Sequence, residues 1–195
     1  MVDPLILASS SPRRQELLSR VGIPFEICVP EVDESCSLPA EEAVAELSRR
    51  KALACRHEFP GRFILGADTL VALDGKKLGK PHDPEDARRM LRFLSGRTHH
   101  VFTGITVLNP RGEILTGTDV SSVTFEPMTE TEIAAYVAGG EPMDKAGAYA
   151  IQGKAALWIR RMTGSPSGVI GLPLALVRSL LIKSGFSLWT HDSIQ

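Results

Sequence analysis

The sequence predicts an α/β fold in which helices flank a central mixed sheet. Short apolar segments typical of strands alternate with segments in which apolar residues recur every three or four positions. With 195 residues, 43% of them hydrophobic, the chain can bury on the order of 70% of its unfolded surface. We therefore expect residues 1–188 to form a single domain, and residues 189–195, which lack periodicity, to form a mobile tail.

The strands and helices follow from these patterns in chain order. The strand-like segments are residues 5–8, 25–29, 63–67, 104–108 and 113–125. The helical segments are residues 12–21, a stretch after residue 37, and residues 83–96, 129–139 and 174–183. Pro12 suits a first helical position, Thr129 and Glu132 have the spacing of a capping box, and Gly22 and Gly185 indicate helix ends. A polar loop at residues 164–168 is expected to lead into the last helix.

Composition excludes several classes of protein. A formal net charge of −1 disfavours a protein that coats nucleic acid, because such proteins carry a broad basic surface. No apolar run approaches the roughly 20 residues needed to span a bilayer, and no leader is evident, so we expect a cytoplasmic protein without membrane contact. Cys28, Cys36 and Cys55 are odd in number and lack C-x-x-C spacing, which predicts neither a disulfide framework nor a zinc site.

Serines and arginines gather where the first strand passes into the first helix. Ser9, Ser10 and Ser11 offer hydroxyls next to the unpaired N–H groups of a helix N-terminus. Arg13 and Arg14 add guanidinium groups whose geometry matches phosphate oxygens. This pattern predicts a phosphate-binding cradle, and the alternative is an ordinary capped helix with solvated arginines.

Further charged residues stand beside predicted strands and helices. Asp68 directly follows the strand at 63–67, where ligands of open α/β sheets bind, although it could instead cap a turn. Glu34 lies in an acidic loop and is a candidate ligand for Mg²⁺ or Mn²⁺. Lys51 shares an apolar helix face and Lys80 precedes a proline, so each either binds phosphate or extends its ammonium to solvent. Gln152, in a segment rich in small residues, can donate and accept hydrogen bonds as a base-reading amide does.

Other polar pairs point to structural roles. His99 and His100 are adjacent in an extended segment, so their side chains should point to opposite faces and make a poor chelating pair. The hydroxyls at residues 9–11 have no histidine partner evident from the sequence, and the cysteines have no activating neighbours. Covalent catalysis is therefore not expected.

Taken together, these motifs resemble the Maf family. The matching segments are residues 9–18, 32–34, 51–52, 66–69, 80–81, 102–105, 144–149 and 151–153. They follow one another in the family's order from about residue 5 to residue 188. The resemblance implies an elongated α/β domain around a central cleft, similar to inosine triphosphate pyrophosphatases. It also implies a cytoplasmic nucleoside triphosphate pyrophosphatase, often a homodimer, that uses a divalent cation such as Mg²⁺, Mn²⁺ or Co²⁺.

The resemblance also assigns roles to individual residues. Asp68 would be the general base or a metal-bound carboxylate, with Glu34, Lys51 and Lys80 completing the phosphate and metal site. Ser9 and Arg14 would hold the triphosphate.

Three positions separate the branches of the family. Arg13, Thr69 and Gln152 look like the branch that acts on dTTP and UTP. We therefore expect hydrolysis of these nucleotides, and of CTP or modified pyrimidine nucleotides, to the monophosphate and pyrophosphate. The alternative is a nucleotide-binding regulator of septum formation with little turnover, because family members have also been called septum-formation inhibitors.

Overall fold

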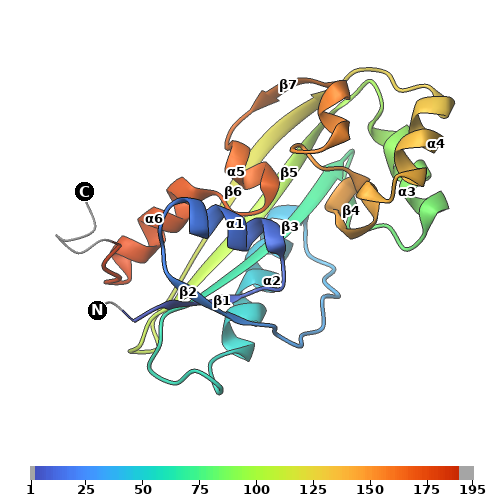
Figure 1. The fold of residues 1–195 in the computed structure, drawn as a ribbon. Coiled ribbons are helices and arrows are strands. Elements are labelled where there is room, and N and C mark those ends of the chain that lie inside the picture. Colours follow the sequence, from blue (N-terminus) through green and yellow to red (C-terminus); the bar gives the residue numbers. More distant parts are fainter. Residues whose placement is uncertain (1–2, 189–195) are drawn as a thin grey trace.

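The computed structural model describes residues 3–188, so the expected tail at 189–195 lies outside the described residues. Its sheet has seven strands in the order β2-β1-β3-β5-β6-β7, with β4 paired to β3 (Figure 1). The strands are β1 (Leu5–Ala8), β2 (Phe25–Cys28), β3 (Ile64–Leu73), β4 (Lys76–Leu78), β5 (Thr98–Leu108), β6 (Ile114–Phe125) and β7 (Ile159–Thr163). β1 pairs in parallel with β2 and β3, and the other pairings are antiparallel, so the predicted mixed sheet is confirmed.

Helices cover both faces of this sheet. They are α1 (Pro12–Arg20), α2 (Ala40–Ala54), α3 (Pro84–Leu94), α4 (Glu130–Ala138), α5 (Pro166–Ile170) and α6 (Leu174–Lys183). Three short 3₁₀ helices, η1 (Glu141–Asp144), η2 (Ala146–Ala148) and η3 (Lys154–Trp158), follow α4. Helices α1, α5 and α6 lie on one face and α2 on the other, while α3 and α4 lie at the far end (Figure 1).

Sequence patterns located most of these elements, and the differences concern long-range pairing. The predicted capping box is present, with Thr129 and Glu132 each bonded to the other's backbone N–H. β5 is longer than the predicted 104–108 because its whole length pairs with β6. The loop expected at 164–168 is partly helical, since the Ser165 side chain accepts a hydrogen bond from Gly168 N–H and caps α5. β7 was not predicted, and it forms by pairing with β6.

Two glycines let α2 approach the sheet closely. A Cβ atom on Gly66 of β3 would lie 2.2 Å from the carbonyl oxygen of Ser48. A Cβ atom on Gly104 of β5 would lie 2.1 Å from the carbonyl oxygen of Val44. Both distances are well below van der Waals contact, so any larger residue would push the helix away from the sheet. The bare backbone at these two positions therefore places Lys51 of α2 against β3.

One edge of β3 changes partner in the middle of the strand. Residues 64–66 pair with β1 and residues 71–73 pair with β4, while β5 pairs along the other edge. Among residues 3–188, no strand pairs with the edge of residues 67–70. Apolar clusters lie on either side of this gap, one around α1 and α6 and another around α3 and α4. The gap lets Asp68, Thr69 and Leu70 of β3 line a cavity.

Asp68 occupies this gap, which corrects the prediction that the strand ends before it. β3 runs on to Leu73, and Asp68 pairs with Gly104 of β5 in the middle of the strand. The apolar residues 70–73 continue the strand because β5 extends equally far. A buried carboxylate in a strand requires a partner, and Lys51 supplies one.

The cysteine prediction was also wrong. Cys28 at the end of β2 and Cys55 at the end of α2 form a disulfide, with their Cα atoms 6.3 Å apart, and Cys36 is free. The two bonded cysteines are 27 residues apart in sequence. They meet because β2 pairs with β1 at the edge of the sheet and the end of α2 packs over that edge, where both cysteines are buried with Ile6. Spacing in the sequence carries no signal of this packing.

Candidate active site

A cleft with a volume of about 780 Å³ opens over the gap in the edge of β3. It contains every residue that the sequence analysis assigned to the site. These lining residues are Ser9, Arg13, Arg14, Glu34, Lys51, Asp68, Thr69, Lys80 and Gln152. They come from segments spread along most of the chain, so the fold brings together residues that the sequence shows only as separate motifs.

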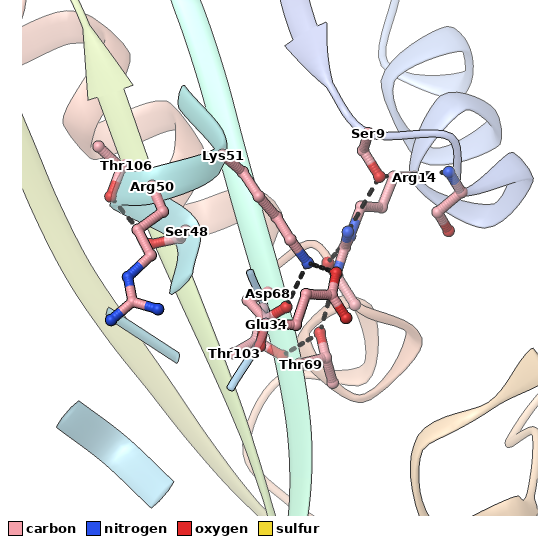
Figure 2. Close-up of polar contacts among 12 residues, drawn as sticks. Ser9, Arg14, Glu34, Ser48, Arg50, Lys51, Asp68, Thr69, Thr103 and Thr106 are labelled. Atoms are coloured by element: carbon pink, nitrogen blue, oxygen red, sulfur yellow. Dashed lines mark hydrogen bonds and ion pairs between the residues drawn. The ribbon is translucent and has the colours of Figure 1, made fainter. Parts of the chain in front are cut away.

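The Lys51 ammonium group lies between two carboxylates on one side of the cleft. Its Nζ donates a hydrogen bond to Oδ1 of Asp68 at 2.6 Å and forms an ion pair with Oε1 of Glu34 at 2.8 Å (Figure 2). The Lys51 side chain is 11% exposed and that of Asp68 is 9% exposed, whereas that of Glu34 is 61% exposed. A snorkelling lysine would reach solvent, so the contact with two acids favours the functional interpretation of Lys51.

The two carboxyl groups are shifted in opposite directions. Burial raises the pKa of Asp68 above its ordinary value, and this effect exceeds the opposing attraction of Lys51 and Arg14. The hydrogen bond with Lys51 lowers the pKa of Glu34, and this effect exceeds the cost of its partial burial. Neighbouring acids whose environments shift their pKa values in opposite directions are typical of sites that perform acid–base chemistry. Burial thereby makes Asp68 a stronger base than an ordinary aspartate.

Arg14 spans the other side of the cleft. Its guanidinium donates to the Ser9 hydroxyl at 2.9 Å, to the Gly171 carbonyl at 2.8 Å and to the Thr69 hydroxyl at 3.3 Å (Figure 2). Burial lowers the pKa of Arg14, yet a guanidinium stays protonated in proteins. The Ser11 side chain, at the N-cap of α1, makes no capping hydrogen bond. The geometry therefore favours the cradle over an ordinary capped helix.

Arg13 reaches across the mouth of the cleft. It donates to the Asp144 carboxylate at 2.9 Å and to the Asp144 carbonyl at 3.3 Å, which links α1 to η1. Burial opposes ionisation of Asp144, but hydrogen bonds from Lys145 and Arg13 outweigh it and lower the pKa to about 2. This contact was not predicted, since a separation of 131 residues leaves no local signal in the sequence.

Lys80 and Gln152 line the cleft from two further segments. Lys80 follows β4 and contributes to the electrostatic lowering of the pKa of Glu34. Gln152 follows Tyr149, which also lines the cleft. Both residues therefore share the cavity with the Lys51 cluster, and their roles toward a ligand stay predictions.

His99 supports the cleft from behind and does not line it. Its ring is fully buried, and its Nε2 lies 2.8 Å from the Tyr149 hydroxyl. Burial, with a smaller contribution from His100, lowers the pKa of His99 to about 4. His100 is exposed on the opposite face of β5. The structure therefore places the two rings on opposite faces, as predicted.

The carboxylates allow a test of whether the site could hold a metal ion. Within residues 3–188, no three His, Cys, Asp or Glu side chains gather into a metal-binding group. Glu34 and Asp68, the predicted ligands, offer two carboxylates held by one ammonium. Mg²⁺ in nucleotide enzymes takes one or two protein carboxylates and completes its shell with water and substrate phosphates. The donor set therefore fits an ion that binds together with a phosphate ligand.

Sequence comparisons relate nearly the whole chain to known proteins. A family model described as "Maf-like protein" matches residues 4–184. A "dTTP/UTP pyrophosphatase" of Symbiobacterium thermophilum is 50% identical over 193 residues, covering 97% of this chain and 98% of that protein. One of Moorella thermoacetica with the same name is 48% identical over 191 residues, covering 96% and 98%.

A solved structure shares the fold. The Ham1 protein of Staphylococcus aureus aligns with a TM-score of 0.52 at 14% identity, covering 93% of this chain and 99% of that one. This likeness confirms the predicted fold class. Separately, across residues 3–188, none of the helices combines the length and apolar character needed to cross a bilayer.

Proposed function

This chain belongs to the Maf family, and we propose that it is a nucleoside triphosphate pyrophosphatase that hydrolyses dTTP and UTP. The observation that carries the proposal is the meeting, in one cleft, of an arginine cradle and two carboxylates joined by one lysine. Relatives named dTTP/UTP pyrophosphatase, 48–50% identical over nearly the full chain, support it. They do not favour the alternative of a septum-formation regulator with little turnover.

The proposed reaction cleaves the bond between the α and β phosphates. Asp68 accepts a proton from water as the water oxygen forms a bond to the α phosphorus, because burial makes this carboxylate a stronger base than an ordinary aspartate. The bond from the α phosphorus to the bridging oxygen breaks, and pyrophosphate leaves with the electron pair. The products are a nucleoside monophosphate and pyrophosphate.

Cationic side chains stabilise the charge that builds up on the leaving group. Arg14, anchored by Ser9 and the Gly171 carbonyl, holds the triphosphate, and Lys51 and Lys80 add positive charge nearby. Glu34 and Asp68 would hold a divalent cation such as Mg²⁺, Mn²⁺ or Co²⁺. Such an ion supplies charge neutralisation on the phosphate oxygens.

We assign recognition of the nucleobase to residues on the remaining walls of the cleft. Thr69 lies beside Arg14, Arg13 reaches over the mouth, and Gln152 offers an amide that can both donate and accept. These residues would favour thymine and uracil. CTP and modified pyrimidine nucleotides are further candidate substrates.

We further propose that the protein works in the cytoplasm, where nucleoside triphosphates are available. Thiols stay reduced there, so the reaction must proceed without the Cys28–Cys55 bond. The homodimer implied by the family resemblance stays a prediction, which analytical ultracentrifugation would test. Binding to nucleic acid is not part of the proposed activity.

A product assay with a substrate panel tests the function. The purified protein is incubated with Mg²⁺ or Mn²⁺ and dTTP, UTP, CTP, GTP or 7-methyl-GTP, and pyrophosphate and monophosphate are measured. We expect equal amounts of both products, with the highest kcat/KM for dTTP and UTP. Asp68→Asn should retain binding and lose about 10²–10⁴-fold in kcat, because it removes the base. Inorganic phosphate as the product, or full activity of this variant, would contradict the mechanism.

A further inference from the structure

The loop that carries Glu34 has little backbone support of its own. Residues 29–39, between β2 and α2, contain neither helix nor strand. Among residues 3–188, the backbone–backbone hydrogen bonds outside helices and strands include none to residues 30–38. A local turn forms where Asp33 accepts from the Ser35 N–H and hydroxyl. Side chains from elsewhere must therefore fix where this loop lies.

Arg50 holds the backbone on both sides of Glu34. Its Nη1 donates to the Asp33 carbonyl at 3.1 Å and to the Ser35 carbonyl at 3.0 Å. Its Nε donates to the Glu46 carboxylate at 2.9 Å, which directs the guanidinium toward the loop. Arg50 directly precedes Lys51 on α2 (Figure 2). Two successive residues of one helix thus hold the backbone and the carboxylate of the same loop segment.

Lys77 holds the same loop from a different part of the fold. This residue lies on β4, and its Nζ donates to the Cys36 carbonyl at 2.6 Å and to the Leu38 carbonyl at 2.7 Å. Charged donors make stronger hydrogen bonds than neutral ones, and each cation here bonds to two carbonyls. Lys77 of β4 therefore holds residues 36–38, directly after the segment 33–35 that Arg50 of α2 holds.

We infer that Arg50 and Lys77 are positioning residues that set Glu34 against Lys51. The inference rests on the proposed function in one respect, because it takes Glu34 to act in turnover. Both residues act through the loop backbone, and neither is assigned contact with the substrate. Without them the Glu34 side chain, which is 61% exposed, would lose the framework that aims it into the cleft. Removing a group that orients a metal-binding side chain typically lowers metal affinity or activity by about 10- to 100-fold.

Matched controls exist next to each residue. Arg49 also pairs with Glu46 on the exposed side of α2, at 3.0 Å, but within residues 3–188 its side chain donates to Glu46 and not to the loop. Lys76 neighbours Lys77 on β4 and lies 5.3 Å from the centre of the Phe93 ring. Arg50→Met and Lys77→Met are therefore compared with Arg49→Met and Lys76→Met, with thermal unfolding as a check of the fold.

The first measurement is limited proteolysis of the loop at residues 29–39, without substrate or metal, by a glutamate-specific protease that can cut after Glu31 or Glu34. We expect cleavage in this loop to speed up about tenfold in Arg50→Met and Lys77→Met and to stay unchanged in both controls. Lys77→Arg, which keeps a cationic donor, should restore much of the resistance to cleavage. Unchanged cleavage in the two test variants would overturn the inference whatever the enzyme does, so this readout is independent of the proposed function.

The second measurement is a double-mutant cycle on activity. We expect Arg50→Met to lower kcat for dTTP about 10- to 100-fold with little change in KM. In a Glu34→Gln background the same substitution should have almost no further effect, since it acts through Glu34. Equal losses in both backgrounds, or a looser loop with wild-type kcat, would overturn the positioning role. A wild-type protein that releases no pyrophosphate would refute the proposed function and leave the proteolysis result to decide the loop contacts.

Discussion

Lys51 and Asp68 form the innermost ion pair of the cleft, with Nζ and Oδ1 2.6 Å apart. The same ammonium also lies 2.8 Å from Glu34, so one positive charge serves two carboxylates. This arrangement explains how β3 carries a buried aspartate in mid-strand. It also means that the protonation of both acids depends on one lysine.

Replacing Lys51 by Met should shift the acid side of the pH–rate profile. The Lys51 hydrogen bond lowers the pKa of Glu34, and its charge also lowers the already raised pKa of Asp68. Without the lysine both pKa values rise, so both acids stay protonated to higher pH. We expect the acid limb of kcat/KM to move to higher pH and kcat at pH 7 to fall about 10²–10³-fold. Lys76→Met is the control, and an unmoved acid limb would contradict the coupling.

The contact between Arg13 and Asp144 predicts that Asp144 and the substrate compete for Arg13 at the mouth of the cleft. A triphosphate that recruits the Arg13 guanidinium must displace the Asp144 carboxylate, which lies 2.9 Å from it. Because the Asp144 pKa is lowered to about 2, this acid is ionised throughout the working pH range, and only substitution can remove its charge. Asp144→Asn should lower KM for dTTP about 2- to 10-fold, since the competing charge is gone.

The control for this competition is an ion pair outside the cleft. Glu16→Gln removes the partner of Arg20 on α1, a pair with both side chains at least half exposed. We expect KM to stay unchanged in that variant. A raised KM in Asp144→Asn would mean that Asp144 orients Arg13 for the substrate and does not compete with it.

The parts of this site that the sequence predicted rest on local signals. Pro12 and the serines before it mark a strand-to-helix turn because N-terminal helix chemistry depends on neighbouring residues. Thr129 and Glu132 are recognisable as a capping box for the same reason. The motifs around the charged residues were each short. Only the family resemblance predicted that these residues meet in one site.

Local sequence patterns could not predict the contacts between distant segments. Cys28 meets Cys55 only because β2 pairs with β1 and the end of α2 packs over these two strands. Asp68 lies in mid-strand only because β5 extends beside it. The Arg50 bonds to the loop around Glu34 depend on the approach of α2 to the sheet. Each of these depends on tertiary placement, which overrides propensity.

Reduction of the Cys28–Cys55 disulfide should lower stability and leave activity unchanged. Closing a loop between residues 27 apart stabilises a fold by about 3–4 kcal/mol, chiefly through the unfolded chain. The contacts of Lys51 with Glu34 and Asp68 do not include either cysteine. We therefore expect dithiothreitol to lower Tm by several degrees while kcat/KM for dTTP stays the same.

Thiol counting provides the direct check of that bond. Of the three cysteines, only Cys36 is free, so one thiol should react in the denatured, unreduced protein and three after reduction. Cys55→Ser should show the lowered Tm without any reductant, and Cys36→Ser serves as the matched control with an unchanged Tm. Three reactive thiols before reduction would contradict the disulfide.

His99 should make the folded state sensitive to mild acid. Its pKa is lowered from 6.5 to about 4 by burial, so above pH 6.5 the ring is neutral in both states. Between pH 6.5 and 4 the unfolded chain binds a proton that the folded protein does not, and the free energy of unfolding falls by about 3 kcal/mol. Urea unfolding across this range should show that His99→Gln lacks this part of the loss. His100→Gln, on the exposed face of β5, should keep it. The stability difference between wild type and His99→Gln must therefore shrink as the pH falls, and a constant difference would show that His99 does not titrate in this way.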